Sequence, residues 1–240
     1  DVEETAVGAT IVKTEYERML KDDERDIIIS SCCHSINLLI QKHYPQALEF
    51  LADVVSPMQA HCMDIKKRIP NAKTVFIGPC VAKKSEVVDH AIEGNTDYAL
   101  TYSEIRAIMR AKNVELQEDD NTYQEASVYG KRFANSGGVT AAVLESLKEC
   151  NEEIDACVCK ANGAAECKKA LLLLKLGKLP EDFIEGMICE GGCVGGPSAY
   201  RDQNMAKKTR DAMIAEADSR GINKNLSNYA MDSFSMHSKR

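Results

Sequence analysis

The sequence predicts an α/β protein of two lobes, each a small, mainly parallel sheet covered by helices. Short runs rich in β-branched residues alternate with amphipathic helical patterns along the chain. This alternation is typical of parallel strands joined by helices. The chain has 240 residues, of which 44% are hydrophobic, so it can bury a core large enough for two closely packed lobes.

The first half of the chain contributes three strands and two helices to this prediction. Residues 36–55 have a helical pattern that we expect Pro45 to interrupt, because proline lacks the amide hydrogen that a helix interior needs. Residues 102–113 carry apolar side chains at helical spacing, and Ser103 is the expected N-cap. The expected strands span residues 25–31, 72–80 and 96–102.

The second half begins with an acidic stretch, 117–127, which is the expected join between the two lobes. Two further helices are expected at 137–150 and 164–178. A strand and turn at 155–163 and a strand with a glycine-rich turn at 183–192 complete the sheets. The last segment, 200–240, is mostly helical and charged. We expect residues 1–240 to serve one common function.

Charge and hydropathy exclude two classes of partner. The formal net charge is −7, and interleaved acidic and basic residues argue against a nucleic-acid surface. No stretch approaches the ~20 apolar residues of a membrane span. The chain opens with DVEETAVG, which is acidic and lacks the apolar core of a signal peptide. We therefore expect a cytoplasmic protein.

Cysteine is the most informative residue type, with ten copies. A chain of this length without a signal peptide favours thiols or metal ligands over disulfides. Three segments share one design, in which an apolar strand runs into a turn that carries cysteine: IIISSCC (27–33), VFIGPC (75–80) and EGMICEGGCVGG (185–196). Ligands collect beyond the carboxyl ends of parallel strands, so these turns are expected to meet at one cavity.

The three turns supply four thiolates, as many as a [4Fe–4S] cluster needs. They are Cys80, Cys189, Cys193 and one of the adjacent pair Cys32 and Cys33. Neighbouring side chains on an extended chain point to opposite sides, so the two cysteines of the pair cannot easily share one purpose. The metal cluster is then expected between the two lobes.

Other readings of the cysteines and histidines must be weighed. CEGGC at 189–193 has the spacing of a structural zinc pair, but no second close pair completes such a site. Core packing is the expected role of the remaining thiols: Cys62, Cys150, Cys157, Cys159 and Cys167. His34 adjoins the cysteine pair and could act with it. The other histidines are expected to face solvent: His43, His61, His90 and His237.

The three cysteine segments resemble the cluster-binding motifs of [FeFe]-hydrogenases, which read T-S-C-C-P-x-W, M-P-C-x-x-K-x-E and E-x-M-x-C-x-x-x-C-x-x-G-G. Here they stand as SSCCHSI (30–36), GPCVAKKSE (78–86) and EGMICEGGCVGG (185–196), in the same order and with similar wide spacing. YGKRFANSGGV (129–139) and KANGAAE (160–166) resemble further stretches of that domain. The resemblance covers nearly the whole chain.

The resemblance implies a cofactor of two parts, the H-cluster. A [4Fe–4S] subcluster would be held by Cys33, Cys80, Cys189 and Cys193. Cys193 would also bridge to a two-iron subcluster that carries CO, cyanide and a bridging azadithiolate. The other cavity-lining residues implied by position are Pro57, Met58, Gly78, Pro79, Phe133 and Met187. Both parts can be missing from a protein made without its maturation enzymes.

Four further residues would carry the chemistry in the implied site. Lys83 would hydrogen-bond a cyanide and pair with Glu86. Cys32 would face the distal iron and transfer protons, so that one cysteine of the adjacent pair holds the cluster and the other moves the proton. Glu17 would occupy the place of the outer glutamate of a proton relay.

Departures from the family pattern concern the proton route and the surroundings of the cluster. The inner relay glutamate falls on Thr14, the relay serine on Ala52, and a glutamine near the distal iron on Met58. His34 and Ile36 replace the proline and tryptophan after the cysteine pair, and Gly78 replaces a methionine. These losses suggest slow turnover and the sensory branch of the family.

The expected activity is reversible H₂ oxidation and proton reduction by an anaerobic oxidoreductase, slow and serving hydrogen sensing. The chain contains no C-x₂-C-x₂-C run of ferredoxin type, so a ferredoxin-like iron–sulfur domain is the expected electron partner and signalling domains are possible neighbours. The alternative is a [4Fe–4S]-binding module without the two-iron site, for iron–sulfur assembly or electron transfer. A structural zinc protein is a third, weaker reading.

Overall fold

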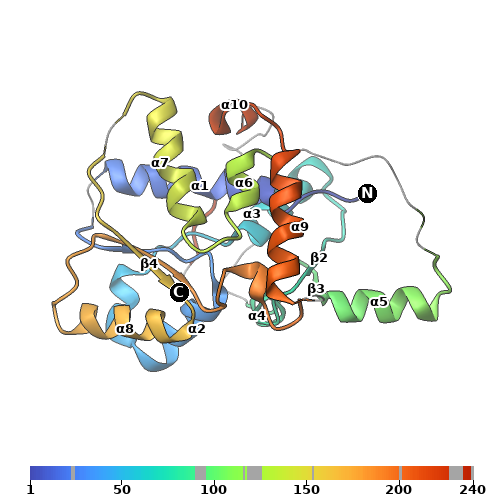
Figure 1. Ribbon diagram of the computed structural model, residues 1–240, viewed down its shortest axis with the longest axis horizontal. Coiled ribbons are helices and arrows are strands. Elements are labelled where there is room, and N and C mark those ends of the chain that lie inside the picture. Colours follow the sequence, from blue (N-terminus) through green and yellow to red (C-terminus); the bar gives the residue numbers. More distant parts are fainter. Residues whose placement is uncertain are drawn as a thin grey trace.

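The structure is a computed structural model, which describes residues 1–22, 25–89, 96–115, 117, 126–152, 154–199, 202–226 and 235–238. Two separate parallel sheets lie among helices (Figure 1). One sheet has three strands in the order β1-β5-β4, and the other pairs β2 with β3. The α/β prediction, with small parallel sheets covered by helices, is confirmed.

The three-stranded sheet is enclosed on both faces. Its strands are β1 (Ile28–Ile29), β5 (Phe183–Met187) and β4 (Val158–Asn162). All five residues of β5 are buried, as expected of a central parallel strand. Phe183 packs in a core with α1 (Ala6–Lys21) and α7 (Gly138–Glu149). Ile184 packs on the other face with α2 (His34–His43) and α8 (Ala164–Lys175).

The two-stranded sheet is more open. Strand β2 (Val75–Gly78) pairs in parallel with β3 (Tyr98–Thr101), and the side chains of Val75, Ile77 and Tyr98 are exposed. The short helix α4 (Ala82–Val87) follows β2, and α5 (Tyr102–Ala111) follows β3. Helix α5 has no buried residue and extends away from the rest of the protein (Figure 1).

The N-cap prediction for α5 is wrong by two residues. Thr101, not Ser103, caps the helix. Its side chain accepts a hydrogen bond from the backbone N–H of Glu104, and the Glu104 carboxylate accepts one from the backbone N–H of Thr101. This reciprocal capping box satisfies two amides that the helix would otherwise leave without partners.

Two long helices were not among the sequence predictions, α1 and α3 (Pro57–Arg68), and they pack closely on each other. A Cβ on Gly8 would come within 2.0 Å of the backbone oxygen of Pro57, so only glycine permits this approach. Buried polar residues such as Thr10 and Lys13 interrupt the apolar pattern of α1, which explains why periodicity did not reveal it.

Shorter elements complete the described chain. The expected break at Pro45 is confirmed, since α2 ends at His43 and a 3₁₀ helix, η1, runs over Pro45–Phe50. The remaining elements are α6 (Val128–Arg132), η2 (Cys193–Gly195), α9 (Gln203–Ala215) and α10 (Ile222–Leu226). Most of the expected lobe join at 117–127 lies outside the described residues, as does His90. Within the described residues, no helix is both long and apolar enough to cross a membrane.

Candidate metal centre

The cysteine turns lie at the carboxyl ends of three strands. Cys32 and Cys33 follow β1, Cys80 follows β2 by two residues, and Cys189 follows β5 by two residues. Parallel pairing of β1 with β5 brings the first and third turns to the same edge of the larger sheet. The turn after β2 approaches from the smaller sheet. Cys193 lies further along the third turn, at the start of η2.

Electrostatic interactions indicate that four of these sulfurs, those of Cys33, Cys80, Cys189 and Cys193, lie near one another. Burial raises the pKa of the Cys193 thiol to about 12, and the charges of Cys33, Cys80 and Cys189 contribute to that rise. The pKa of Cys189 is raised by burial and then by Cys33 and Cys80. The side chain of Cys193 is exposed to solvent and lines a cavity.

No three His, Cys, Asp or Glu side chains in the described part of the chain are close enough together to hold a single metal ion. A structural zinc ion needs its ligands in one tight tetrahedron. In a four-iron cluster each thiolate binds a different iron, so the sulfurs surround a larger object. The three cysteine turns carry the four thiols that such a cluster needs.

The backbone of the third turn is shaped by glycine. Gly192 has a φ of +88°, and a Cβ there would lie 2.2 Å from the backbone oxygen of Ala134. The next amide, that of Cys193, donates a hydrogen bond to the same oxygen at 2.7 Å. A side chain at position 192 would therefore separate the turn from residues 134–136 and displace Cys193.

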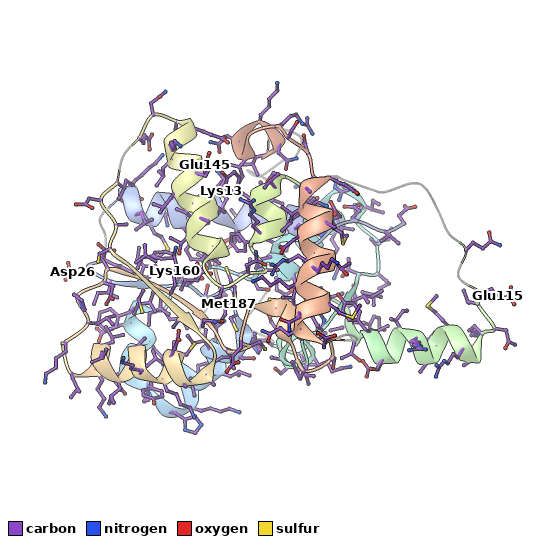
Figure 2. All side chains as sticks on the ribbon, viewed as in Figure 1. Lys13, Asp26, Glu115, Glu145, Lys160 and Met187 are labelled. Atoms are coloured by element: carbon purple, nitrogen blue, oxygen red, sulfur yellow. The ribbon has the colours of Figure 1, made fainter. Side chains whose placement is uncertain are left out.

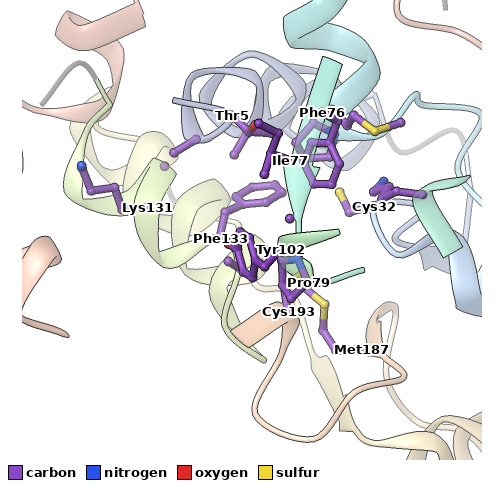
Figure 3. A pocket seen from close by; sticks show the side chains of 18 residues that line it. Thr5, Cys32, Phe76, Ile77, Pro79, Tyr102, Lys131, Phe133, Met187 and Cys193 are labelled. Atoms are coloured by element: carbon purple, nitrogen blue, oxygen red, sulfur yellow. The ribbon is translucent and has the colours of Figure 1, made fainter. Parts of the chain in front are cut away.

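A mainly apolar cavity of about 240 Å³ is lined by Cys193 and by residues of both sheets, among them Gly78 of β2 and Met187 of β5; Figure 3 shows the lining side chains. It receives side chains from α1, α3, β2, α6 and the ends of the cysteine turns. The residues that the resemblance implied at the cofactor and that line this cavity are Cys32, Pro57, Met58, Gly78, Pro79, Lys83, Phe133, Met187 and Cys193. Further lining residues that were not predicted include Thr5, Phe76, Ile77 and Tyr102.

Lys83 places a buried positive charge at this cavity. Its Nζ lies 2.5 Å from Oε2 of Glu86, and both side chains are buried on α4. Burial alone would lower the pKa of Lys83, but Glu86 and, to a smaller extent, Cys80 and Cys193 raise it above its usual value. Burial would raise the pKa of Glu86, yet the ion pair holds it below the usual value. The pair is therefore charged, with the ammonium available to an anionic group.

Cys32 contacts a residue that sequence reasoning missed. The hydroxyl of Tyr16, on α1, lies 3.3 Å from the Cys32 sulfur and 3.1 Å from Oγ of Ser31. Burial raises the pKa of Cys32 to about 11, against the opposing effect of the Tyr16 hydrogen bond. No local sequence pattern indicates this role for Tyr16, because the contact depends on how α1 packs against the turn that follows β1.

Residues 1–197 match the family model described as "Iron only hydrogenase large subunit, C-terminal domain". The chain belongs to this family. Iron hydrogenase 1 of Clostridium pasteurianum is 26% identical, over 76% of this chain and 39% of that protein. The periplasmic [Fe] hydrogenase large subunit of Nitratidesulfovibrio vulgaris is 25% identical, over 75% of this chain and 53% of its own. The chain thus spans about half or less of these relatives.

Solved structures show the same fold. An apo variant of [FeFe]-hydrogenase HydA1 from Chlamydomonas reinhardtii superposes with a TM-score of 0.69. The superposition covers 96% of this chain and 78% of that one, at 18% sequence identity. A structure described as showing oxygen inactivation of [FeFe]-hydrogenase through its H-cluster gives a TM-score of 0.68, covering 93% of this chain and 76% of that one at 19% identity.

Glu17 of this hydrogenase domain lies outside the cavity. Its carboxylate accepts hydrogen bonds of 3.0 and 3.1 Å from the ammonium of Lys13, which is fully buried. Lys13, which is labelled in Figure 2, also donates to Ser146 and, at 2.6 Å, to Asn223, so that it links α1 to α7 and α10. The carboxylate of Glu17 thus belongs to a largely buried ion pair with Lys13.

Several expectations about the other thiols and histidines of the hydrogenase domain are wrong. Cys150 and Cys157 are exposed and do not pack in the core, because they lie just after α7 and just before β4. Cys159 is half-buried, whereas Cys62 and Cys167 are buried as expected. His43 and His237 are exposed, as expected. His61 is buried instead, and its Nε2 lies 3.0 Å from Oε2 of Glu3.

His34 is buried beside the charged pair. Its Nδ1 lies 3.9 Å from Oε2 of Glu86. Since Glu86 also contacts Lys83, an imidazole, a carboxylate and an ammonium follow one another from α2 to the cavity wall. The substitution of proline by His34 thus adds a polar group behind the Lys83 side chain.

Proposed function

We propose that this chain is the H-cluster domain of an [FeFe]-hydrogenase that interconverts H₂ with protons and electrons, slowly and in a sensory role. Cys33, Cys80, Cys189 and Cys193 would hold the [4Fe–4S] part. The two-iron part, with CO, cyanide and a bridging azadithiolate, would occupy the adjoining cavity and supply the site where H₂ is split or formed. The family membership and the gathered thiols support this assignment.

The observation that carries the proposal is the cavity beyond the four cysteines. A protein that binds only a cubane has no need of a second enclosed space with a thiol and an ammonium on its wall. Here Cys32 and Lys83 both reach that wall, which is otherwise mainly apolar. An apolar wall excludes water and strengthens each electrostatic contact within it. The donor set therefore fits a two-part cofactor with anionic ligands.

Each residue has a defined task in this proposal. The Lys83 ammonium would donate hydrogen bonds to a cyanide ligand, with Glu86 fixing its position. Cys32, which is not needed as a ligand, would pass protons between the cofactor and the protein. Pro57, Met58, Gly78, Pro79, Phe133 and Met187 would shape the pocket and exclude water. Glu17 remains proposed as an outer group of the proton route, although its contacts are structural.

Slow turnover is part of the proposal and follows from the proton route. Cys32 meets a tyrosine hydroxyl, which is far less basic than a carboxylate and cannot readily take the proton onward. We further propose that electrons come from a ferredoxin-like iron–sulfur domain and that signalling domains accompany this one. A cytoplasmic location and anaerobic operation belong to the same proposal.

Infrared spectroscopy tests the assignment directly. The domain is reconstituted with iron and sulfide in the absence of oxygen and then supplied with a synthetic two-iron precursor. We expect bound CO and cyanide bands and detectable H₂ activity. A cubane signal without those bands would instead indicate a [4Fe–4S] module for assembly or electron transfer.

Replacement of Cys32 by alanine separates the two cysteines of the pair. We expect the Cys32→Ala variant to retain about as much iron as the parent protein and to lose most H₂ activity, because general acid–base groups typically contribute ~10²–10⁴-fold. Iron content and activity are measured on the same samples. Loss of iron from this variant would make Cys32 a ligand and reverse the two assignments.

A further inference from the structure

Tyr16 is buried, and its hydroxyl has few hydrogen-bond partners within reach. The side chain is fully buried, and its ring packs edge-on against Phe183 with centroids 6.0 Å apart. The backbone N–H of Ser31 donates to the Tyr16 oxygen at 3.0 Å. The Ser31 hydroxyl donates its own proton to the backbone oxygen of Val54 at 2.6 Å. Oγ of Ser31 is therefore an acceptor, not a donor, towards Tyr16.

The single hydroxyl proton of Tyr16 then has two acceptors within reach, Oγ of Ser31 at 3.1 Å and the sulfur of Cys32 at 3.3 Å. If it is donated to Ser31, the Tyr16 oxygen can accept the thiol proton of Cys32. If it is donated to the sulfur, the thiol proton of Cys32 must turn elsewhere, and the cavity is the space that Cys32 faces. Hydroxyl hydrogens rotate freely between such partners.

We propose that Tyr16 is a positioning residue whose hydroxyl has two orientations, and that these set whether the Cys32 thiol proton is held against Tyr16 or points into the cavity. With the cavity empty, the orientation towards Ser31 is favoured, because oxygen is a better acceptor than a thiol sulfur. The Tyr16 proton itself stays on the phenol throughout.

The Ser30 hydroxyl is the competing partner that must be tested. It lies near both Cys32 and Tyr16, and it contributes a hydrogen-bond effect to the pKa of each. Tyr16 is the better placed of the two, because its contact with the sulfur is a defined hydrogen bond at 3.3 Å. Ser30 and Tyr16 can be told apart by removing one hydroxyl at a time.

The S–H stretching band in the infrared reports the proposal in the cluster-free domain, without any need for H₂ activity. The Cys32 band is assigned by difference from Cys32→Ala. We expect Tyr16→Phe to move it to higher wavenumber, because the thiol loses its acceptor. Ser31→Ala is expected to move the band in the same direction, since Tyr16 then donates to the sulfur. Exposed Tyr98→Phe is the matched control and leaves the band unchanged.

Two results would overturn the proposal: a band that neither variant moves, or one that Ser30→Ala moves and Tyr16→Phe does not. Because Ser31→Ala keeps the tyrosine and its ring packing, it preserves the test if Tyr16→Phe fails to fold.

The consequence for turnover rests on the proposed function. In the loaded domain we expect Tyr16→Phe to slow H₂ turnover, because the hydroxyl that turns the thiol proton of Cys32 into the cavity is lost. The expected factor is about five, which one neutral hydrogen bond supports, and the iron content is expected to stay unchanged. Failure of the proposed function would show as missing CO and cyanide bands and would leave the S–H result intact.

Discussion

At the scale of single residues, the cysteines were the most predictable part of the site. Cys80 and Cys189 each follow a strand by two residues, so local sequence alone placed them at strand ends. Tyr16 could not be predicted in this way. Its contact with Cys32 depends on how α1 lies across the sheet, which is a property of tertiary packing and leaves no local pattern.

Glu17→Gln is expected to affect stability more than catalysis. The substitution removes the charge that partners the buried ammonium of Lys13, and breaking a buried ion pair from one side costs roughly 3 kcal/mol. Urea denaturation measures the change in the free energy of unfolding. Glu15→Gln, on the same helix and paired with exposed Arg18, is the control and is expected to cost well under 1 kcal/mol. An equal loss for both variants would contradict the structural role of Glu17.

Cys157, Cys159 and Cys167 are expected not to bind the cluster. Burial raises the pKa of Cys167 to about 12, and the charge of Cys33 contributes to that rise, so Cys167 lies near one of the proposed ligands. Replacement of all three by alanine is expected to leave the iron content of the reconstituted domain unchanged. Metal analysis of the purified variant decides the matter, and a loss of about four irons, a full cubane, would show that one of them is a ligand.

At the scale of elements, the strands and covering helices followed from the alternation of apolar runs, whereas helices α1 and α3 did not. Both carry buried polar side chains that bond to residues far away in the sequence: Lys13 on α1 donates to Asn223, and Gln59 on α3 accepts from Thr96. A period-based prediction counts such residues as exposed. The helices that were missed are therefore those whose buried faces mix polar and apolar groups.

Helix α5 tests how far a capping box alone can support an element. It buries no side chain, so its stability depends on local interactions more than on packing. We expect Thr101→Ala to weaken its N-terminus by about 1 kcal/mol. Amide hydrogen exchange is expected to accelerate in 102–105 and to stay unchanged in α8. Ser103→Ala is the control, because that hydroxyl is not the cap.

At the scale of the whole molecule, the cavity joins parts of the chain that are far apart in sequence. Met58 on α3, Gly78 on β2 and Met187 on β5 line it together with Phe133, the C-cap residue of α6. The sequence could place each motif at a strand end, but the shape of the space between them depends on how the two sheets are held. That relation depends on tertiary packing and was not predictable from the motifs.

Cluster assembly is expected to stabilise the entire domain. A ligand that binds only the folded state stabilises that state. At a ligand concentration of about 100 times its Kd, the expected rise in Tm is roughly 5–10 °C for a domain of this size. Calorimetry before and after anaerobic reconstitution measures the rise. Cys80→Ser is expected to abolish it and the exposed control Cys150→Ser to retain it. A rise that survives in Cys80→Ser would point to adventitious iron.

The pairing of β1 with β5 limits how early the larger sheet can form during synthesis on the ribosome. Ile28 emerges early, yet its partner Phe183 is made much later, on the order of ten seconds at ordinary elongation rates. During that interval the cysteine pair after β1 belongs to a nascent strand whose native neighbour is not yet synthesised. The first cysteine turn can therefore reach its native position only after translation has nearly reached the third cysteine turn. Iron insertion is accordingly expected to be post-translational.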